Sequence, residues 1–364
     1  MDDAHSRNHL IKSFNNQFGR EPMALAHAHG RANLIGEHTD YNDGLVLPCL
    51  ISNRTEVALA IRDDDLVCGI SNQFLAGQKA IYDGLDGHWL DFVIGALHQL
   101  LPVGGGLQGI DIAVKSDIPP SAGVSSSAAL EIAILRALVT AQQLPSVTDT
   151  QLALFAQRIE HDFIGTRCGI MDQMVVAAAM PGDCMMLDCR SLDYKLMSLP
   201  AGHVVAVVHS GSVRKLSDTV YNQRLAECAA AAQILGVSSL RDATTGMFGN
   251  VVLDNEMKRA KHVVSENVRV QAAVNCLVRN DPSGLGNLMN KSHDSLCDDY
   301  EVSSPELDRL VSSLRSAGAL GARLTGAGFG GCVVALCETA SANDIVSRAV
   351  EMNPDSYLID LIDN

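Results

Sequence analysis

Aromatic residues are scarce in this chain of 364 residues, at 4% of the sequence with a single tryptophan, Trp89. Stacking the bases of single-stranded nucleic acid needs several aromatic rings, so the composition argues against such a platform. Positive charge is also in deficit, because 27 lysines and arginines stand against 42 aspartates and glutamates, a formal net charge of −15. Since an acidic surface repels phosphate backbones and anionic lipids, we expect neither nucleic acid nor a membrane as a partner.

Several motifs are missing as well. No apolar run approaches the roughly 20 residues that span a bilayer, and the first residues do not read as a secretory signal. The ten cysteines form no CxxC pair and mostly lie in apolar runs, which predicts reduced, buried thiols in a cytoplasmic protein. The chain contains no Gly-Lys dipeptide and no HExxH, which excludes a Walker A phosphate loop and that zinc motif.

The length and the hydrophobic content of 47% predict a folded protein with a sizeable core. At roughly 100–200 residues per domain, we expect two domains. The turn-rich stretch 191–202 is the best candidate for their boundary, which gives an N-terminal domain at 1–195 and a C-terminal domain at 203–364. Strands and helices alternate irregularly, so the predicted class is α+β rather than a βαβ repeat.

Hydrophobic periodicity and turn residues predict the individual elements. Helices are expected at about 1–20, 91–101, 128–143, 149–164, 216–235, 255–278, 283–296, 304–317 and 340–351. Strands are expected at 54–61, 65–70, 108–115, 183–187 and 203–209, with a strand, a glycine turn and a second strand over 319–337.

A Pro/Gly/Ser segment at 116–127 leads directly into the predicted helix 128–143. The first N–H groups of a helix have no partner within it and carry the positive end of its dipole, so they attract phosphate. Serine hydroxyls at this end can bond a phosphate oxygen or a divalent metal. An ordinary serine N-cap explains the segment equally well, and nothing local decides between the two.

A second glycine-rich segment, 324–331, formally matches GxGxxG through Gly326, Gly328 and Gly331. The dinucleotide fingerprint needs a helix after the glycines, and here a predicted strand follows, so we reject that interpretation. Either a turn that brings bare backbone against a ligand or a glycine-rich hairpin without one remains.

Two polar clusters could carry chemistry. Residues 30–44, GRANLIGEHTDYNDG, place an imidazole and several carboxylates between apolar segments, as a sugar site requires, although a polar surface loop fits too. Asp172 lies among apolar residues at 170–175, where an aspartate is costly unless it is paired or functional. Close to an arginine it would stay ionised and could accept a proton from a hydroxyl; a structural aspartate at a helix start is the alternative.

Taken together, these segments resemble the galactokinase branch of the galacto-, homoserine, mevalonate and phosphomevalonate (GHMP) kinases. The residues at 30–44 resemble the galactokinase signature, PPSAGVSSSAALE the second motif of the family, and LTGAGFGGC the third. CGIMDQ, SDTVYNQR (217–224) and AKHVVSEN (260–267) are similar to further galactokinase segments, in the expected order.

The resemblance implies a two-domain α+β fold with the active site in the cleft between the domains. It implies phosphorylation of the C1 hydroxyl of α-D-galactose by ATP with Mg²⁺, the first committed step of galactose (Leloir) metabolism, by a cytoplasmic monomer. By matching positions, Asp172 is the base and Arg31 its cationic partner. The implied sugar contacts are Arg31, Glu37, His38, Asp40, Gly169, Asp172 and Tyr221. The implied nucleotide contacts are Pro120, Ser121, Ala122, Gly123, Val124, Ser125, Ser126, Ser127 and Ala128, and the metal ligands are Ser127 and Glu160.

The chain departs from the family pattern at a few positions. Ala28-His29-Gly30-Arg31 replaces the usual Ala-Pro-Gly-Arg, and Val124 stands where leucine is common. Another sugar, such as N-acetylgalactosamine, arabinose or a uronic acid, would use the same chemistry. Some relatives bind sugar and ATP as regulators without turnover, but the intact serine motif together with Glu160 and Asp172 favours catalysis.

Overall fold

The computed structural model describes residues 3–212, 217–248 and 254–363. Packing divides the chain into two compact units, each assembled from separate stretches. Unit 1 consists of 1–30, 53–120 and 125–178, and unit 2 of 31–52, 121–124 and 179–364. The predicted functional domains, 1–195 and 203–364, remain a prediction.

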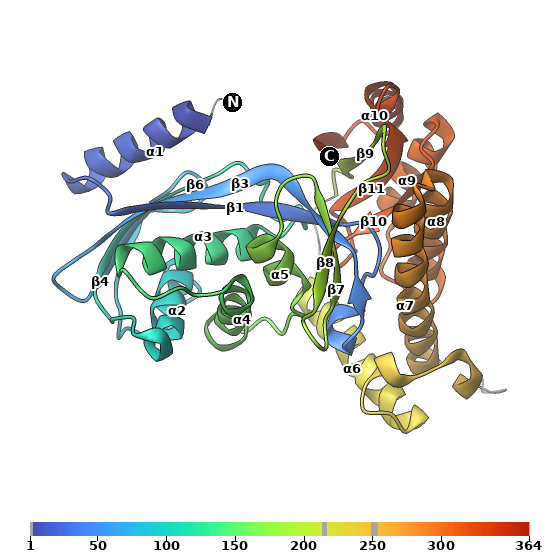
Figure 1. The fold of residues 1–364 in the computed structure, drawn as a ribbon, viewed down its shortest axis with the longest axis horizontal. Helices are drawn as coiled ribbons and strands as arrows, with labels where there is room; N and C mark the ends of the chain where they lie inside the picture. The colour runs from blue at the N-terminus through green and yellow to red at the C-terminus, as the bar shows by residue number, and fades with distance from the viewer. Residues whose placement is uncertain (1–2, 213–216, 249–253, 364) are drawn as a thin grey trace. The chain divides into compact units, whose positions relative to one another are not determined.

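Unit 1 is built on a mixed sheet with helices on both faces (Figure 1). In the sheet β3 pairs antiparallel with β6, β6 parallel with β4, and β4 antiparallel with β5, while β1 pairs with β3. Strands β1 and β3 continue into unit 2. The strands are β1 (Ala24–Asn33), β3 (Pro48–Ile61), β4 (Leu66–Ser71), β5 (Gly77–Ala80) and β6 (Ile110–Ser116). The helices are α1 (Asp3–Phe18), α2 (Leu90–Leu100), α3 (Ser126–Ala141), α4 (Asp149–Ile159) and α5 (Met171–Ala178), with a π-helical turn at Glu160–Ile164.

Helix α1 covers one face of this sheet, and α2 and α3 lie on the other (Figure 1). Leu10 and Phe14 of α1 pack on small alanines of β3 and β6, which let the helix approach closely. Helix α3 is apolar on nearly all sides and packs against α2, α4 and α5, as expected of a helix in the centre of a core. The start of α3 is thereby fixed by packing along its length.

Unit 2 contains a four-stranded antiparallel sheet in the order β10-β11-β9-β12. It also contains strands of the mixed sheet, in which β7 pairs antiparallel with β2, with β8 and with Cys49 of β3. The strands are β2 (Leu45–Val46), β7 (Asp183–Asp188), β8 (Tyr194–Ser198), β9 (His203–His209), β10 (Gly321–Thr325), β11 (Cys332–Glu338) and β12 (Tyr357–Ile362). The helices are α6 (Ser217–Leu235), α7 (Asn255–Arg279), α8 (Pro282–Asp298), α9 (Pro305–Ala317) and α10 (Ala342–Glu351).

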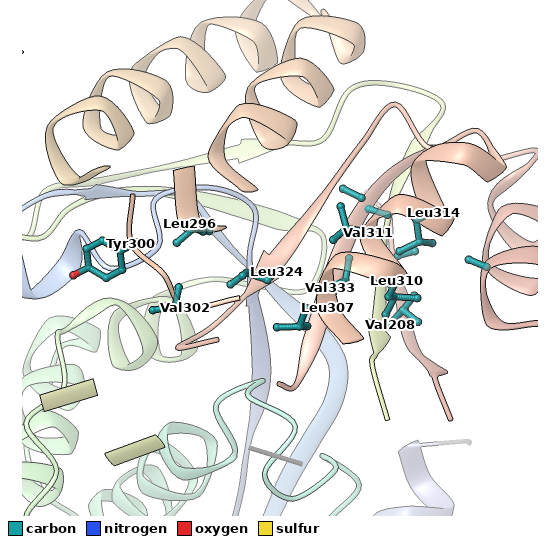
Figure 2. Close-up of a cluster of buried hydrophobic side chains, with 14 of the residues drawn as sticks. Val208, Leu296, Tyr300, Val302, Leu307, Leu310, Val311, Leu314, Leu324 and Val333 are labelled. Carbon is teal, nitrogen blue, oxygen red and sulfur yellow. The ribbon is translucent and has the colours of Figure 1, made fainter. Parts of the chain in front are cut away.

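The core of unit 2 lies between the four-stranded sheet and its helices. Figure 2 shows Leu307, Leu310 and Leu314 of α9 in this cluster together with Val208 of β9 and Val333 of β11. The leucines recur at helical spacing along one face of α9, and the valines come from paired strands, so one apolar stripe meets one sheet face.

The predicted α+β class is confirmed, and most predicted helices and strands occur within a few residues of their expected bounds. Two expectations for loops are corrected. The stretch 191–202 contains β8, whose mostly exposed side chains give no hydrophobic signal and which forms by pairing with β7. The polar stretch 30–44 begins inside β1, which extends to Asn33. Among the described residues, no helix has the length and apolar character needed to cross a bilayer.

Candidate active site

The serine-led segment of unit 1 forms the first turn of α3. Ser125 occupies the N-cap position in the left-handed region, with φ 60° and ψ 50°, and its side chain makes no capping hydrogen bond. Its hydroxyl instead donates to Oδ2 of Asp172, in the first turn of α5. The ordinary N-cap interpretation is therefore wrong for Ser125. The first N–H groups of α3, left without a side-chain cap, suit an anionic oxygen.

Three carboxyl groups of unit 1 gather around this turn: Glu131, Glu160 and Asp172. The Ser127 hydroxyl lies near enough to the Glu160 carboxyl to favour its charged form, so the two residues predicted as metal ligands do lie together. Burial raises the pKa of Glu160, and the nearby Ser127 hydroxyl opposes that rise. Burial also raises the pKa of Glu131 well above its ordinary value, and the neighbouring Glu160 raises it further.

The Ser127 hydroxyl and the Glu160 carboxyl offer oxygen atoms of the kind that a hard divalent cation binds. Glu131 is 0% exposed, and neither of its carboxyl oxygens receives a hydrogen bond from an N–H or O–H donor in the described structure. Mg²⁺ binds carboxylate and hydroxyl oxygens, and a cation would offset the mutual repulsion of the three acids. The residues present therefore match Mg²⁺.

A cavity of about 240 Å³ opens in unit 1 beside Ser126 and Ser127. Its lining is largely apolar, with polar groups contributed by two strands and the loop after β4. The other lining residues are Thr55, Gln73, Phe74, Phe92, Val114, Ser116 and Leu130. An apolar cavity with a few polar groups suits a flat heterocycle.

In unit 2, Arg31 binds the 121–124 segment, although 90 residues of sequence separate them. Its backbone N–H donates to the Val124 oxygen at 3.0 Å, and its Nη1 donates to the Gly123 oxygen at 2.8 Å. The Cys332 thiol lies 3.1 Å from the Ala122 oxygen. The signature, residues 121–124 and the end of the glycine-rich third motif therefore lie together in unit 2.

Glu37 is a buried side chain of the signature that has several polar partners. It is 2% exposed, and its Oε2 accepts from Asn33 Nδ2 at 2.7 Å, while Oε1 accepts from the Gly326 N–H at 2.5 Å. The guanidinium of Arg323, 0% exposed, lies 3.6 Å from Oε1. The carboxylate thus fixes the signature to the turn after β10.

His38 begins a chain of buried hydroxyl groups. Its Nδ1 lies 2.7 Å from the Tyr41 hydroxyl, which lies 2.7 Å from the Tyr300 hydroxyl. Burial lowers the pKa of His38 well below its ordinary value, and nearby His262 lowers it further, so the imidazole is neutral. The Tyr221 ring lies 6.0 Å from the His38 ring, centroid to centroid. A neutral imidazole held in this way can bond a sugar hydroxyl.

The structure groups the predicted site residues by unit. Asp40 opens a 3₁₀ turn, Asp40–Asn42, and lies in unit 2 with the other signature residues and Tyr221. Gly169 is buried just before α5 in unit 1. Unit 1 also holds Pro120 and Ser125 to Ala128, whereas Ser121 to Val124 belong to unit 2. The predicted pairing of Arg31 with Asp172 stays a prediction.

Sequence reasoning missed Glu131, Arg323 and Glu266. Glu266 is fully buried; its Oε1 accepts from the Gly36 N–H at 2.9 Å, and its Oε2 accepts from Arg269 Nε at 2.5 Å. Glu131 and Arg323 each interrupt an apolar run, and a charged residue in such a run is costly unless it has a partner. That signal could have identified both.

Three family models match separate parts of the chain. A galactokinase galactose-binding signature matches residues 12–61, a GHMP kinase N-terminal domain matches 91–180, and a GHMP kinase C-terminal domain matches 273–355. The first contains the signature residues Arg31 to Asp40, and the second contains the serine-led turn, Glu160 and Asp172.

Solved structures of three kinases are similar to this chain. A galactokinase from Lactococcus lactis, solved with galactose, is 29% identical, with 99% of each chain covered and a TM-score of 0.88. A mevalonate kinase from Methanococcus jannaschii is 17% identical, covering 95% of this chain and 99% of that one, at a TM-score of 0.70. A phosphomevalonate kinase from Streptococcus pneumoniae is 14% identical, covering 93% and 99%, also at 0.70.

The two more distant likenesses establish the fold alone, whereas the signature and the Lactococcus structure agree on the branch. The chain therefore belongs to the galactokinases, within the GHMP kinase family.

Proposed function

We propose that this galactokinase transfers the γ-phosphoryl group of ATP to the C1 hydroxyl of α-D-galactose, giving galactose 1-phosphate and ADP. The observation that carries the proposal is the galactose-binding signature over residues 12–61, in which Glu37 and His38 are buried and held in place by hydrogen bonds. The oxygen of C1 forms a bond to the γ-phosphorus, the bond to the β-phosphate oxygen breaks, and the hydroxyl proton passes to a base.

Asp172 is the proposed base. The Ser125 hydroxyl donates to its Oδ2, which holds the carboxylate in one orientation. A base must point at the proton it removes, and a positioned base contributes about 10²–10⁴ in rate. Ser125 is therefore a positioning residue for Asp172.

The nucleotide is proposed to bind at the start of α3. The uncapped N–H groups of the first turn face the phosphates, and the purine occupies the cavity beside Ser126 and Ser127. Ser127 and Glu160 would hold Mg²⁺, which supplies charge neutralisation at the transferred phosphoryl group. Arg31, which bonds the Gly123 oxygen, adds a second positive charge.

The proposed sugar contacts are Arg31, Glu37, His38, Asp40, Gly169, Asp172 and Tyr221. The neutral imidazole of His38 can accept or donate one hydrogen bond, and its orientation is set by Tyr41. Hydroxyl groups of fixed stereochemistry are selected by such fixed donors and acceptors.

Phosphorus NMR of a reaction with ATP, Mg²⁺ and galactose tests this function. We expect a new phosphomonoester signal coupled to the anomeric proton of galactose. A signal from another position, or no ADP release with galactose, would refute the proposal. A panel with N-acetylgalactosamine, arabinose and a uronic acid should release ADP more slowly.

The base is tested by Asp172→Asn. We expect turnover to fall by about 10²–10⁴ while galactose binding stays measurable by calorimetry. Asp65→Asn, at an exposed aspartate of the same unit, is the matched control and should leave turnover unchanged. Unchanged turnover in the Asp172 variant would remove that residue as the base.

The proposed setting is the cytoplasm, with the protein acting as a monomer. All ten cysteines are free thiols in the structure, which is typical of a reducing compartment. Native mass measurement and cell fractionation test the two points separately.

A further inference from the structure

A cluster of three metal-binding side chain types lies in unit 2, apart from the residues discussed above. His293 and Cys297 are one turn apart on α8, and Asp308 is in the first turn of α9. Among the described residues, this is the one group of three histidine, cysteine or acidic side chains whose ligand atoms all lie within 4.8 Å of one another. His293 is buried, Cys297 half-buried and Asp308 exposed, so one side of the cluster opens to solvent.

The distances within the cluster can be compared with those of a metal site. The Cys297 Sγ lies 3.6 Å from His293 Nε2 and 3.4 Å from Asp308 Oδ1, and Nε2 lies 3.4 Å from that Oδ1. Zinc bonds of about 2.3 Å to sulfur, about 2.0–2.1 Å to nitrogen and about 2.0–2.2 Å to oxygen place tetrahedral ligand atoms roughly 3.4–3.6 Å apart. All three edges therefore agree with a tetrahedron around one ion.

We propose that His293 Nε2, Cys297 Sγ and Asp308 Oδ1 form a three-ligand site for a divalent transition metal, with zinc as the best match. One imidazole, one thiolate and one carboxylate are a donor set that suits zinc and not Mg²⁺ or Ca²⁺. The fourth position faces solvent and takes a water molecule. When the ion binds, the Cys297 thiol releases its proton to solvent.

The same atoms form hydrogen bonds when no metal is bound. Asp308 Oδ1 then accepts from Ser303 and Cys297, and Nε2 of His293 faces the same oxygen. The Leu324 N–H lies 3.4 Å from His293 Nδ1, longer than an ordinary hydrogen bond. Since a metal on Nε2 requires the ring proton on Nδ1, metal binding breaks this long contact.

The location suggests what the ion would do. Leu296 and Leu307, which directly precede Cys297 and Asp308, both lie in the buried cluster of Figure 2. Helices α8 and α9 both pack against β10. A metal would therefore cross-link the two helices at the edge of a core they already share, and stabilise unit 2 by mass action.

Cobalt(II) substitution tests the site in the full-length protein after removal of metals with a chelator. Cobalt bound to a thiolate gives a near-ultraviolet charge-transfer band, and a tetrahedral site gives intense visible bands. We expect both bands to saturate at one equivalent and to disappear on addition of zinc. Cys297→Ala should abolish the charge-transfer band, and Asp308→Asn should weaken cobalt binding by more than about tenfold.

Cys276→Ala is the matched control, because this half-buried thiol lies on the neighbouring helix α7 and should leave the bands unchanged. Cys168 lies near Glu160 and could itself bind cobalt, so a band that persists in Cys297→Ala overturns the proposal. Absence of any thiolate band in the wild-type protein overturns it too. Zinc should raise the unfolding temperature of the wild type and of Cys276→Ala, and not that of Cys297→Ala. Equal unfolding temperatures of the three proteins in chelator show that each is folded.

Discussion

The buried pair of Glu37 and Arg323 gives a quantitative prediction for the variant Glu37→Gln. The substitution keeps the side chain's size and removes its charge, leaving the Arg323 guanidinium in a place where it is 0% exposed. The new amide also cannot accept from both Asn33 and Gly326, because one of its two ends is now a donor.

The expected cost follows from these contacts. Removing one member of a buried ion pair costs about 3–5 kcal/mol, since the other charge is left uncompensated. Glu266 also acts on Arg323, so part of the compensation remains and the lower end, about 3 kcal/mol, applies. At about 2–4 °C per kcal/mol for a unit of this size, the unfolding temperature should fall by about 6–12 °C.

Urea and thermal unfolding of a double-mutant cycle measure this effect. Arg323→Met fills the same space without charge, so the double variant Glu37→Gln/Arg323→Met should be more stable than Glu37→Gln alone. A higher free energy of unfolding in the double variant than in Glu37→Gln would show that the uncompensated cation, and not the loss of hydrogen bonds, causes most of the destabilisation. If Glu37→Gln lies within about 1 kcal/mol of the wild type, or if the second substitution recovers nothing, the reasoning is wrong.

Three further outcomes are expected. Burial, partly opposed by Glu266, lowers the pKa of His262 to about 4 in the folded chain. As the pH falls below about 6.5, the imidazole is therefore protonated in the unfolded chain while it stays neutral in the folded one. The stability advantage of the wild type over His262→Gln, from urea unfolding, should therefore narrow by about 2 kcal/mol between pH 7 and pH 5; a constant difference would contradict this. Tyr300→Phe breaks the hydroxyl chain, and should raise KM for galactose several-fold with a smaller change in kcat; equal changes in both would argue against a positioning effect. Gly328→Ala would drive a Cβ into the backbone oxygen of Val302, whereas Gly104→Ala, also at positive φ, meets nothing within 4 Å. Thermal unfolding should show the Gly328 variant to be the less stable by more than about 1 kcal/mol, and equal losses in the two variants would contradict the expected clash.

Local signals predicted the helices well. The bounds of α9 could be read from Ser304, Pro305 and Gly318, which are its N-cap, its first helical residue and its C-cap in the structure. The strand β9 was found at its observed bounds, since its run of valines has no helical period. Elements that are specified by residues within a short segment can therefore be predicted from the sequence of that segment.

Elements that depend on distant partners were not predictable in this way. Strand β8 has mostly exposed side chains and exists through its pairing with β7. The candidate site follows the same rule. The motifs named Glu37 and His38, but nothing near them in sequence indicates Arg323 or Tyr300 as partners. Those contacts are set by the tertiary fold.

The interleaved course of the chain has a consequence for its synthesis. The Gly326 N–H that bonds Glu37 lies 289 positions further along. At translation rates of about 5–20 residues per second, the signature leaves the ribosome roughly 15–60 seconds before this partner exists. During that interval its buried carboxylate and imidazole must stay hydrated or be shielded by a chaperone. Unit 1, whose residues have all been synthesised by Ala178, can fold during that interval.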